Sequence, residues 1–269
     1  GLLINTGNIY SSGHWILDAT SINAEHHSSG IIELSGSSGK LTLGNSDTLV
    51  IDAAGYLVVG SNGGTSIIDA SASGAAMQLG GTLAIGDTII TTNGVEAPQL
   101  SEVVGQLTID TSSAFTVNPN SIVKVGVTFG GSNDALIVTG TTGVLRLEGG
   151  LLSVASGFSS NTSAALITAT SILGSFDTID GLVFFDTNGD RTVADVVQTA
   201  TGITLTPVSN ASGVLAEGDG TGSVFDFGDS ANANFTHYLA LSGDDLVKGV
   251  DSGDSAFGEA GDDTFVLNS

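Results

Sequence analysis

The sequence predicts an all-β protein whose larger part is a β-solenoid, that is, a parallel β-helix. Three observations predict this fold. Short apolar runs rich in Val, Ile and Leu recur from about residue 30 to residue 170, and each is of strand length. Turn-forming residues, above all the 39 glycines of the chain, close nearly every run. No stretch keeps the 3.6-residue apolar period of a helix without a glycine interruption.

The shortness of the predicted strands favours a solenoid, in which small polar residues stack at the corners and aliphatic side chains fill the interior. A polar turn that leads into a four-residue predicted strand occurs twice, as GNSDTLVI at 44–51 and GSNDALIV at 131–138. A β-sandwich is the alternative fold. The predicted strands span residues 41–43, 48–51, 56–59, 66–68, 82–85, 88–90, 106–109, 121–125, 135–138, 144–147 and 151–154.

The charge of the chain is almost entirely acidic, with 28 Asp and Glu against 5 Lys and Arg and a net charge of −23. This balance argues against a nucleic-acid partner and against anionic membrane surfaces, because both are bound through Lys and Arg. A hydrophobic share of 41% indicates a folded chain. The chain has no cysteine, which excludes disulfides and thiolate metal sites, and no apolar run is long enough for a membrane span.

The aspartates are spread unevenly along the chain. Fourteen of the 21 lie between Asp177 and Asp263, which indicates a boundary near residue 170. We therefore expect three parts: a β-solenoid body over residues 1–170, an acidic β-rich segment over 171–239, and a distinct C-terminal segment over 240–269.

The C-terminal segment repeats every nine residues. Asp245, Asp254 and Asp263 keep this spacing, and an apolar residue or alanine follows each of them two positions later. The stretches GVDSGDSAF at 249–257 and GEAGDDTFV at 258–266 resemble the nonapeptide G-G-x-G-x-D-x-U-x of the RTX family of secreted bacterial proteins, where U is a large apolar residue.

The resemblance implies a short C-terminal parallel β-roll that binds Ca²⁺, with carboxylate and carbonyl oxygens as ligands. The metal-site residues that it implies are Asp245, Asp254 and Asp263, with Gly243 and Gly261 at the second glycine position. The repeat is degenerate in two ways. Ser252 stands two residues before Asp254, where Gly243 and Gly261 stand before the other two aspartates. Val250 and Glu259 replace the glycine that should directly follow the initial glycine of the nonapeptide. The alternative is an Asp/Gly-rich loop with accidental spacing.

A second candidate Ca²⁺ site lies in DTNGDRTVAD at 186–195. Asp186, Asn188 and Asp190 match the first three oxygen ligands of an EF-hand-like loop, and Asp195 could close a shorter loop. Arg191 stands where that loop needs glycine. Such clusters also form ordinary turns, and this alternative stays open.

Enzyme activity is not expected from the motifs. The chain contains neither the H-E-x-x-H motif of zinc proteases nor the G-x-S-x-G nucleophile elbow. We expect the four histidines, at positions 14, 26, 27 and 237, to be surface residues. His26 and His27 would point to opposite faces of a strand and so would not share a metal ion.

These observations together predict an extracellular, calcium-dependent structural protein of the bacterial cell surface, which the RTX resemblance implies is exported by type I secretion. It would assemble through its solenoid ends into a homo-oligomer or polymer, forming a layer, a filament or an adhesive stalk, because open strand edges need a neighbouring strand. Two alternatives are a monomeric adhesin that binds a glycan, such as a cell-surface polysaccharide, and a polysaccharide-active β-helix enzyme.

Overall fold

The protein is all-β, as the sequence predicts. The structure is a computed structural model, and within the residues that it describes the regular structure is β apart from one 3-10 turn at Ser230–Asn232. No helix in this part of the chain is long and apolar enough to cross a membrane. The described residues are 3–17, 24–35, 39–61, 63–92, 95–99, 104–127, 132–156, 163–185, 191–209 and 213–268.

The chain divides into two compact units, which we describe separately. Unit 1 contains residues 1–186 and 194–206, and unit 2 contains residues 187–193 and 207–269. The predicted boundary at residue 170 falls inside unit 1, and the predicted boundary at residue 239 falls inside unit 2.

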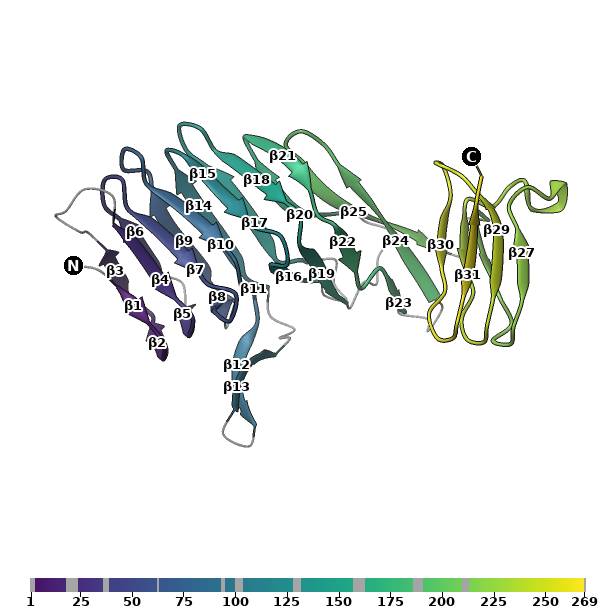
Figure 1. The fold of residues 1–269 in the computed structure, drawn as a ribbon, viewed down its shortest axis with the longest axis horizontal. Helices are drawn as coiled ribbons and strands as arrows, with labels where there is room; N and C mark the ends of the chain where they lie inside the picture. The colour runs from purple at the N-terminus through teal and green to yellow at the C-terminus, as the bar shows by residue number, and fades with distance from the viewer. Residues whose placement is uncertain are drawn as a thin grey trace. The chain divides into compact units, whose positions relative to one another are not determined.

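Unit 1 is built from three sheets, A, B and C, through which the chain passes in turn, so that each circuit adds one strand to each sheet (Figure 1). Sheet A contains β1 (Ile4–Asn5), β4 (Glu25–Ser28), β7 (Thr48–Ile51), β10 (Ala76–Leu79), β15 (Ala114–Val117), β18 (Val144–Glu148) and β21 (Ser171–Ser175). Sheet B contains β2 (Asn8–Ser11), β5 (Ile31–Ser35), β8 (Tyr56–Ser61), β11 (Thr82–Ile85), β16 (Ile122–Val127), β19 (Leu151–Ser156) and β22 (Thr178–Asp180).

Sheet C has nine strands and closes differently from the other two. Its strand β20 pairs antiparallel with β25, and the sheet continues through β24 to β23. Its strands are β3 (His14–Leu17), β6 (Lys40–Leu43), β9 (Thr65–Ala70), β14 (Gln106–Thr111), β17 (Ala135–Thr139), β20 (Ala164–Ala169), β25 (Gly202–Ser209), β24 (Arg191–Gln198) and β23 (Val183–Phe185). The successive circuits of A, B and C pair in parallel, which is compatible with a β-solenoid.

Register explains how the core of unit 1 forms. Leu49, Met77, Phe115 and Leu145 occupy one inward position of four successive strands of sheet A, and all are buried. Such alternating strands bury every second side chain, so each circuit places an apolar residue on the one before it. Burying one large aliphatic or aromatic side chain contributes about 1.5–3 kcal/mol.

One hairpin leaves this pattern. The chain departs after β11, forms the antiparallel pair β12 (Thr88–Thr92) and β13 (Val95–Gln99), and returns at β14. Figure 1 shows this pair projecting from the sheets of unit 1. The predicted strand at 88–90 therefore exists but belongs to a separate sheet of two strands.

Unit 2 is built from two sheets of three parallel strands. Leu246 lies beside Thr264, so one circuit takes 18 residues, whereas the circuit before it, which contains the 3-10 turn, takes 22. Sheet E contains β26 (Leu215–Glu217), β28 (His237–Leu239) and β30 (Ser255–Phe257), and sheet F contains β27 (Val224–Asp226), β29 (Leu246–Val250) and β31 (Thr264–Leu267).

Candidate functional site

Two of the predicted metal-site aspartates lie together in unit 2. Asp245 and Asp263 occupy the same position in successive circuits, one residue before β29 and β31, and the Asp245 backbone N–H donates to Asp263 Oδ1 at 3.0 Å. One circuit earlier, the Ser223 N–H donates to Asp245 Oδ1 at 2.6 Å. We call Ser223, Asp245 and Asp263 the acidic column.

One carboxylate oxygen of Asp245 lacks a hydrogen-bond partner. It is only 2% exposed, and its Oδ2 atom has no hydrogen-bond partner among the described residues. A buried carboxylate oxygen without a donor or a cation is costly, commonly by about 1–3 kcal/mol or more. The acidic column therefore presents an oxygen that a cation or an additional donor would satisfy.

A second pair of aspartates braces the same two circuits. The Asp262 N–H donates to Asp244 Oδ1 at 3.0 Å, in the opposite direction to the bond between Asp245 and Asp263. Both pairs come from the sequence Gly-Asp-Asp, at 243–245 and again at 261–263. The repeat of this tripeptide after one full circuit is the sequence signal that identifies the column.

Asp254 lies apart from the acidic column. It precedes β30 in sheet E, whereas Asp245 and Asp263 precede strands of sheet F, and its Oδ2 accepts from the Asp251 N–H at 3.1 Å within one turn. A step of nine residues moves the chain from one sheet to the other, and only a step of 18 returns it to the same sheet. Within the described ranges, no three Asp, Glu or His side chains are placed so that they could hold a metal ion.

The predicted glycines allow the backbones of successive circuits to lie very close together. Gly243 and Gly261 have φ of 107° and 144°, and a Cβ on Gly261 would lie 1.9 Å from the Gly243 carbonyl oxygen. Leu241 and Glu259, two residues before them, take φ of 78° and 62°, which are left-handed values that disfavour any residue with a Cβ. Leu241 and Glu259 stand where the RTX nonapeptide has the second glycine of its leading pair, so the degenerate repeat keeps the turn at the expense of backbone strain.

The EF-hand-like candidate falls mostly outside the described residues. Asp186, Asn188 and Asp190 lie there, so their site stays a prediction. Asp195 lies within β24, in a strand rather than in a loop.

The expectation of four surface histidines is wrong for two of them, because His26 is 0% and His237 is 6% exposed. The His26 ring lies inside unit 1, where Nδ1 accepts from the Leu3 N–H at 3.1 Å and Nε2 lies 3.5 Å from Asp47 Oδ2. The buried Asp47 offers a partner that the sequence did not reveal, because it lies on the next circuit. His26 and His27 point to opposite faces of β4, as expected.

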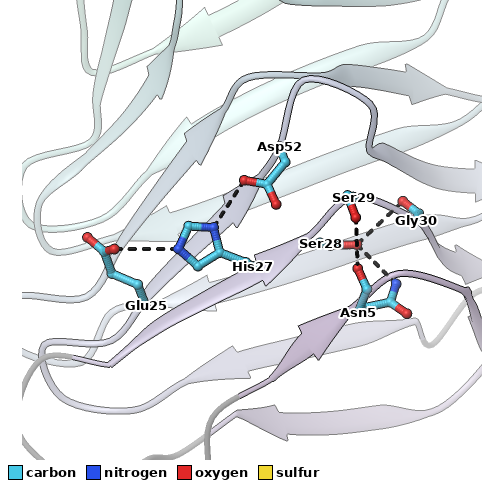
Figure 2. A network of polar contacts seen from close by, with 7 residues as sticks. All are labelled: Asn5, Glu25, His27, Ser28, Ser29, Gly30 and Asp52. Carbon is cyan, nitrogen blue, oxygen red and sulfur yellow. Dashed lines mark hydrogen bonds and ion pairs between the residues drawn. The ribbon is translucent and has the colours of Figure 1, made fainter.

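His27 lies on the outer face of β4 between two carboxylates, as Figure 2 shows. Its Nδ1 lies 3.0 Å from Asp52 Oδ1, and its Nε2 lies 3.5 Å from Glu25 Oε2. The hydrogen bond to Asp52 is the main cause that raises the pKa of His27, and Glu25 adds to it. Nearby, the Asn5 amide donates to Ser28 Oγ at 3.0 Å and ties β1 to β4.

A buried carboxylate lies at the base of the projecting hairpin. Asp134 is 2% exposed and accepts from the N–H groups of Gly105 and Gly126 at 2.7 and 2.5 Å. Burial raises the pKa of Asp134 to about 7, although the two hydrogen bonds oppose the rise and the nearby Asp87 adds to it. Burial also raises the pKa of Asp87, which Lys124 partly offsets.

Comparison with known proteins does not assign this chain to a family. No protein-family model matches the chain, and no curated protein matches it. The assignment of function therefore depends on the residues and geometry described above.

Proposed function

We propose that the protein is an extracellular, calcium-dependent structural protein of the bacterial cell surface, with an RTX-like β-roll in unit 2. The observation that carries the proposal is the buried Asp245 Oδ2, which lacks a partner in a column of oxygen-bearing side chains. The two parallel sheets and the circuit of 18 residues, which is two nonapeptides, support the same reading.

The residues of the acidic column fit Ca²⁺, which binds carboxylate and carbonyl oxygens and tolerates irregular geometry. Asp245 and Asp263 would hold the ion, and Gly243 and Gly261 would shape the turns around it. Asp254 would serve a separate site on the side of sheet E. The stretch with Asp186, Asn188, Asp190 and Asp195 is a further proposed site. Bound Ca²⁺ would supply positive charge that ties successive circuits together.

Calcium also gives the acidic surface a role in assembly. A net charge of −23 repels copies of the chain from one another, and divalent cations reduce this repulsion. Strand β31 exposes Phe265, Val266 and Leu267 at an edge of sheet F. A strand from another copy, or from adjoining chain, would cover such an edge. We propose that copies associate through these edges into a layer, filament or stalk.

The test compares the full chain with and without calcium and follows the response of unit 2. Calorimetric titration with Ca²⁺ should show saturable binding, and a chelator should lower the melting temperature and expose residues 213–268 to protease first. Asp245→Ala combined with Asp263→Ala should reproduce the effect of the chelator, whereas Asp180→Ala, which removes an exposed carboxylate from unit 1, should not.

Electron microscopy of the same samples addresses assembly. We expect large ordered particles with Ca²⁺ and single copies in chelator. Equal melting, proteolysis and particle size in both conditions would rule out the calcium proposal. A calcium-stabilised chain that stays monomeric would retain the site and refute assembly.

A further inference from the structure

A pocket of about 310 Å³ opens at a corner of unit 1 between sheets A and B. Three successive connections form it: β15 to β16, β18 to β19, and β21 to β22. Its volume is at the lower end of the range of ligand sites, about 300–1,000 Å³, and so suits one small ring rather than an extended ligand.

The pocket exists because neighbouring corners differ in length. The connection from β15 to β16 has four residues, 118–121, whereas the next one consists of Gly149 and Gly150 alone. Both glycines have positive φ, at 120° and 89°, and a Cβ on Gly150 would lie 2.7 Å from the Ser121 carbonyl oxygen. The middle corner therefore has no side chain with which to fill the space beside Asn120.

The polar groups at the rim are available to a ligand. Neither the Asn120 amide nor the Thr178 hydroxyl makes a hydrogen bond to another of the described residues, and both residues are exposed. Asp177 accepts from the Gly150 N–H through Oδ2 at 3.0 Å, and its Oδ1 accepts no hydrogen bond from the part of the chain described. The rim thus offers an amide, a hydroxyl and a carboxylate oxygen.

The floor of the pocket is aliphatic. Ile122 and Leu151 are register partners on the outer face of sheet B, and Leu151 is in turn the partner of Thr178. Both aliphatic side chains are half-buried, so they present a small apolar surface directly beside the polar rim. A pyranose ring has the matching chemistry, with a C–H face and hydroxyls around its edge.

Charge restricts the class of sugar. Among the described residues that line the pocket, Asp177 is the only charged one, and the chain as a whole carries −23. An acidic sugar or a phosphate would be repelled by this field. One exposed carboxylate that already accepts a hydrogen bond offers a cation only a weak, solvent-screened attraction.

We propose that this corner pocket binds one neutral pyranose residue of a glycan. Asp177 Oδ1, the Asn120 amide and the Thr178 hydroxyl contact ring hydroxyls, and Ile122 and Leu151 contact the C–H face. The site lies in unit 1 and does not depend on the calcium proposal. It gives a ligand class to the glycan-binding alternative that the sequence left open.

The test uses the full chain with labelled isoleucine and leucine methyl groups in nuclear magnetic resonance titrations. The probes are the methyl glycosides of glucose, galactose and mannose, with methyl glucuronide and glucosamine as charged comparators. We expect saturable shifts at Ile122 and Leu151 with at least one neutral glycoside, at a Kd on the order of 1 mM. The glucuronide should bind about tenfold more weakly or not at all.

Two variants separate binding from folding. Asn120→Gly removes the amide at a residue whose φ of 67° suits glycine, and Thr178→Val removes the hydroxyl at constant shape. Each should weaken binding by about 2- to 10-fold, the value of one hydrogen bond. Ser46→Gly is the control, because it makes the same backbone change at another positive-φ corner, with φ 60°, and should leave binding unchanged.

Three results would overturn the proposal. They are the absence of saturable shifts at Ile122 and Leu151 with every neutral glycoside, unchanged affinity in both variants, and binding of glucosamine alone. The last result would show that the Asp177 charge, rather than hydroxyl recognition, holds the ligand.

Discussion

Unit 1 and unit 2 are both coils of short parallel strands, but they reach stability in different ways. A circuit of unit 1 passes through three sheets and encloses a wide interior filled by ladders of fully buried aliphatic residues and Phe115. A circuit of unit 2 passes through two sheets, and among the described residues its buried cluster contains Phe225, Tyr238, Ala240 and Val247, with partly buried apolar residues packed against it. In unit 2, aspartate side chains brace successive circuits in addition to the apolar contacts.

The difference indicates that the number of sheets in a circuit determines which interactions stabilise it. Two sheets leave room for one thin apolar layer, in which Phe225 stacks on Tyr238 with ring centroids 4.1 Å apart. Three sheets leave room for large apolar side chains from most of their strands, and the burial of these side chains stabilises the circuit. A thin coil therefore depends more strongly on polar bonds, which cations and pH can change.

The largest expected effect concerns the apolar core, where the contrast between the two units is clearest. Phe115→Ala should lower the free energy of unfolding of unit 1 by about 3–5 kcal/mol, because it opens a cavity among fully buried neighbours. Val247→Ala in unit 2 removes fewer atoms and should have a smaller effect. Thermal unfolding in chelator and in excess Ca²⁺ measures both. A calcium-dependent loss for Phe115→Ala would break the contrast.

A second prediction tests whether the stability of unit 1 also depends on pH, because unit 1 contains a buried carboxyl group. The folded-state pKa of Asp134, about 7, lies above its ordinary value of 3.8, so the folded protein prefers the protonated form. The stabilisation is fully present below about pH 4 and is lost as the pH rises through 7, with an upper limit of about 4 kcal/mol. Unit 1 should therefore unfold more easily at pH 8 than at pH 5.

Chemical denaturation at a series of pH values tests this, and Asp134→Asn should flatten the profile. His27 contributes a smaller dependence of the same sign, because its pKa is raised above 6.5 and its stabilising contacts weaken as the pH rises through that raised value. His27→Gln removes this part alone. A profile that keeps its slope in Asp134→Asn would assign the dependence to other groups.

The smallest expected effect concerns backbone strain in unit 2. At Leu241 and Glu259, glycine should be more stabilising than alanine by about 1 kcal/mol, because both residues take left-handed φ values. The comparison of Gly with Ala removes the same side chain in both variants and so isolates the backbone. Urea unfolding of Glu259→Gly and Glu259→Ala gives the difference. The usual order, with alanine more stable than glycine, would mean that the turn relaxes.

Particular elements show how far the sequence could be interpreted. The apolar runs at 48–51 and 82–85 are strands β7 and β11, because β-branched and leucine-rich runs between turn residues leave few other backbone choices. The run at 88–90 is also a strand, yet it pairs within a hairpin rather than with a neighbouring circuit. Local pattern specifies that a segment is extended but not which segment it pairs with.

The candidate site shows the same limit. The spacing of Asp245 and Asp263 indicated that they belong together, and their hydrogen bond agrees. The same spacing grouped Asp254 with them, although the chain places it before a strand of the other sheet. His26 was expected on the surface because nothing local revealed that Asp47 would lie beside it inside the coil.

The sequence by itself determined that this chain forms short strands, that it carries a large negative charge, and that its last aspartates recur at a regular interval. These are properties of neighbouring residues and of composition. Only the tertiary structure decided which aspartates share a side of the coil, which histidines are buried, and where unequal corners leave a pocket. The reason is that a coil brings together residues one circuit apart, and the length of a circuit is set by how many sheets the chain passes through before it meets itself again.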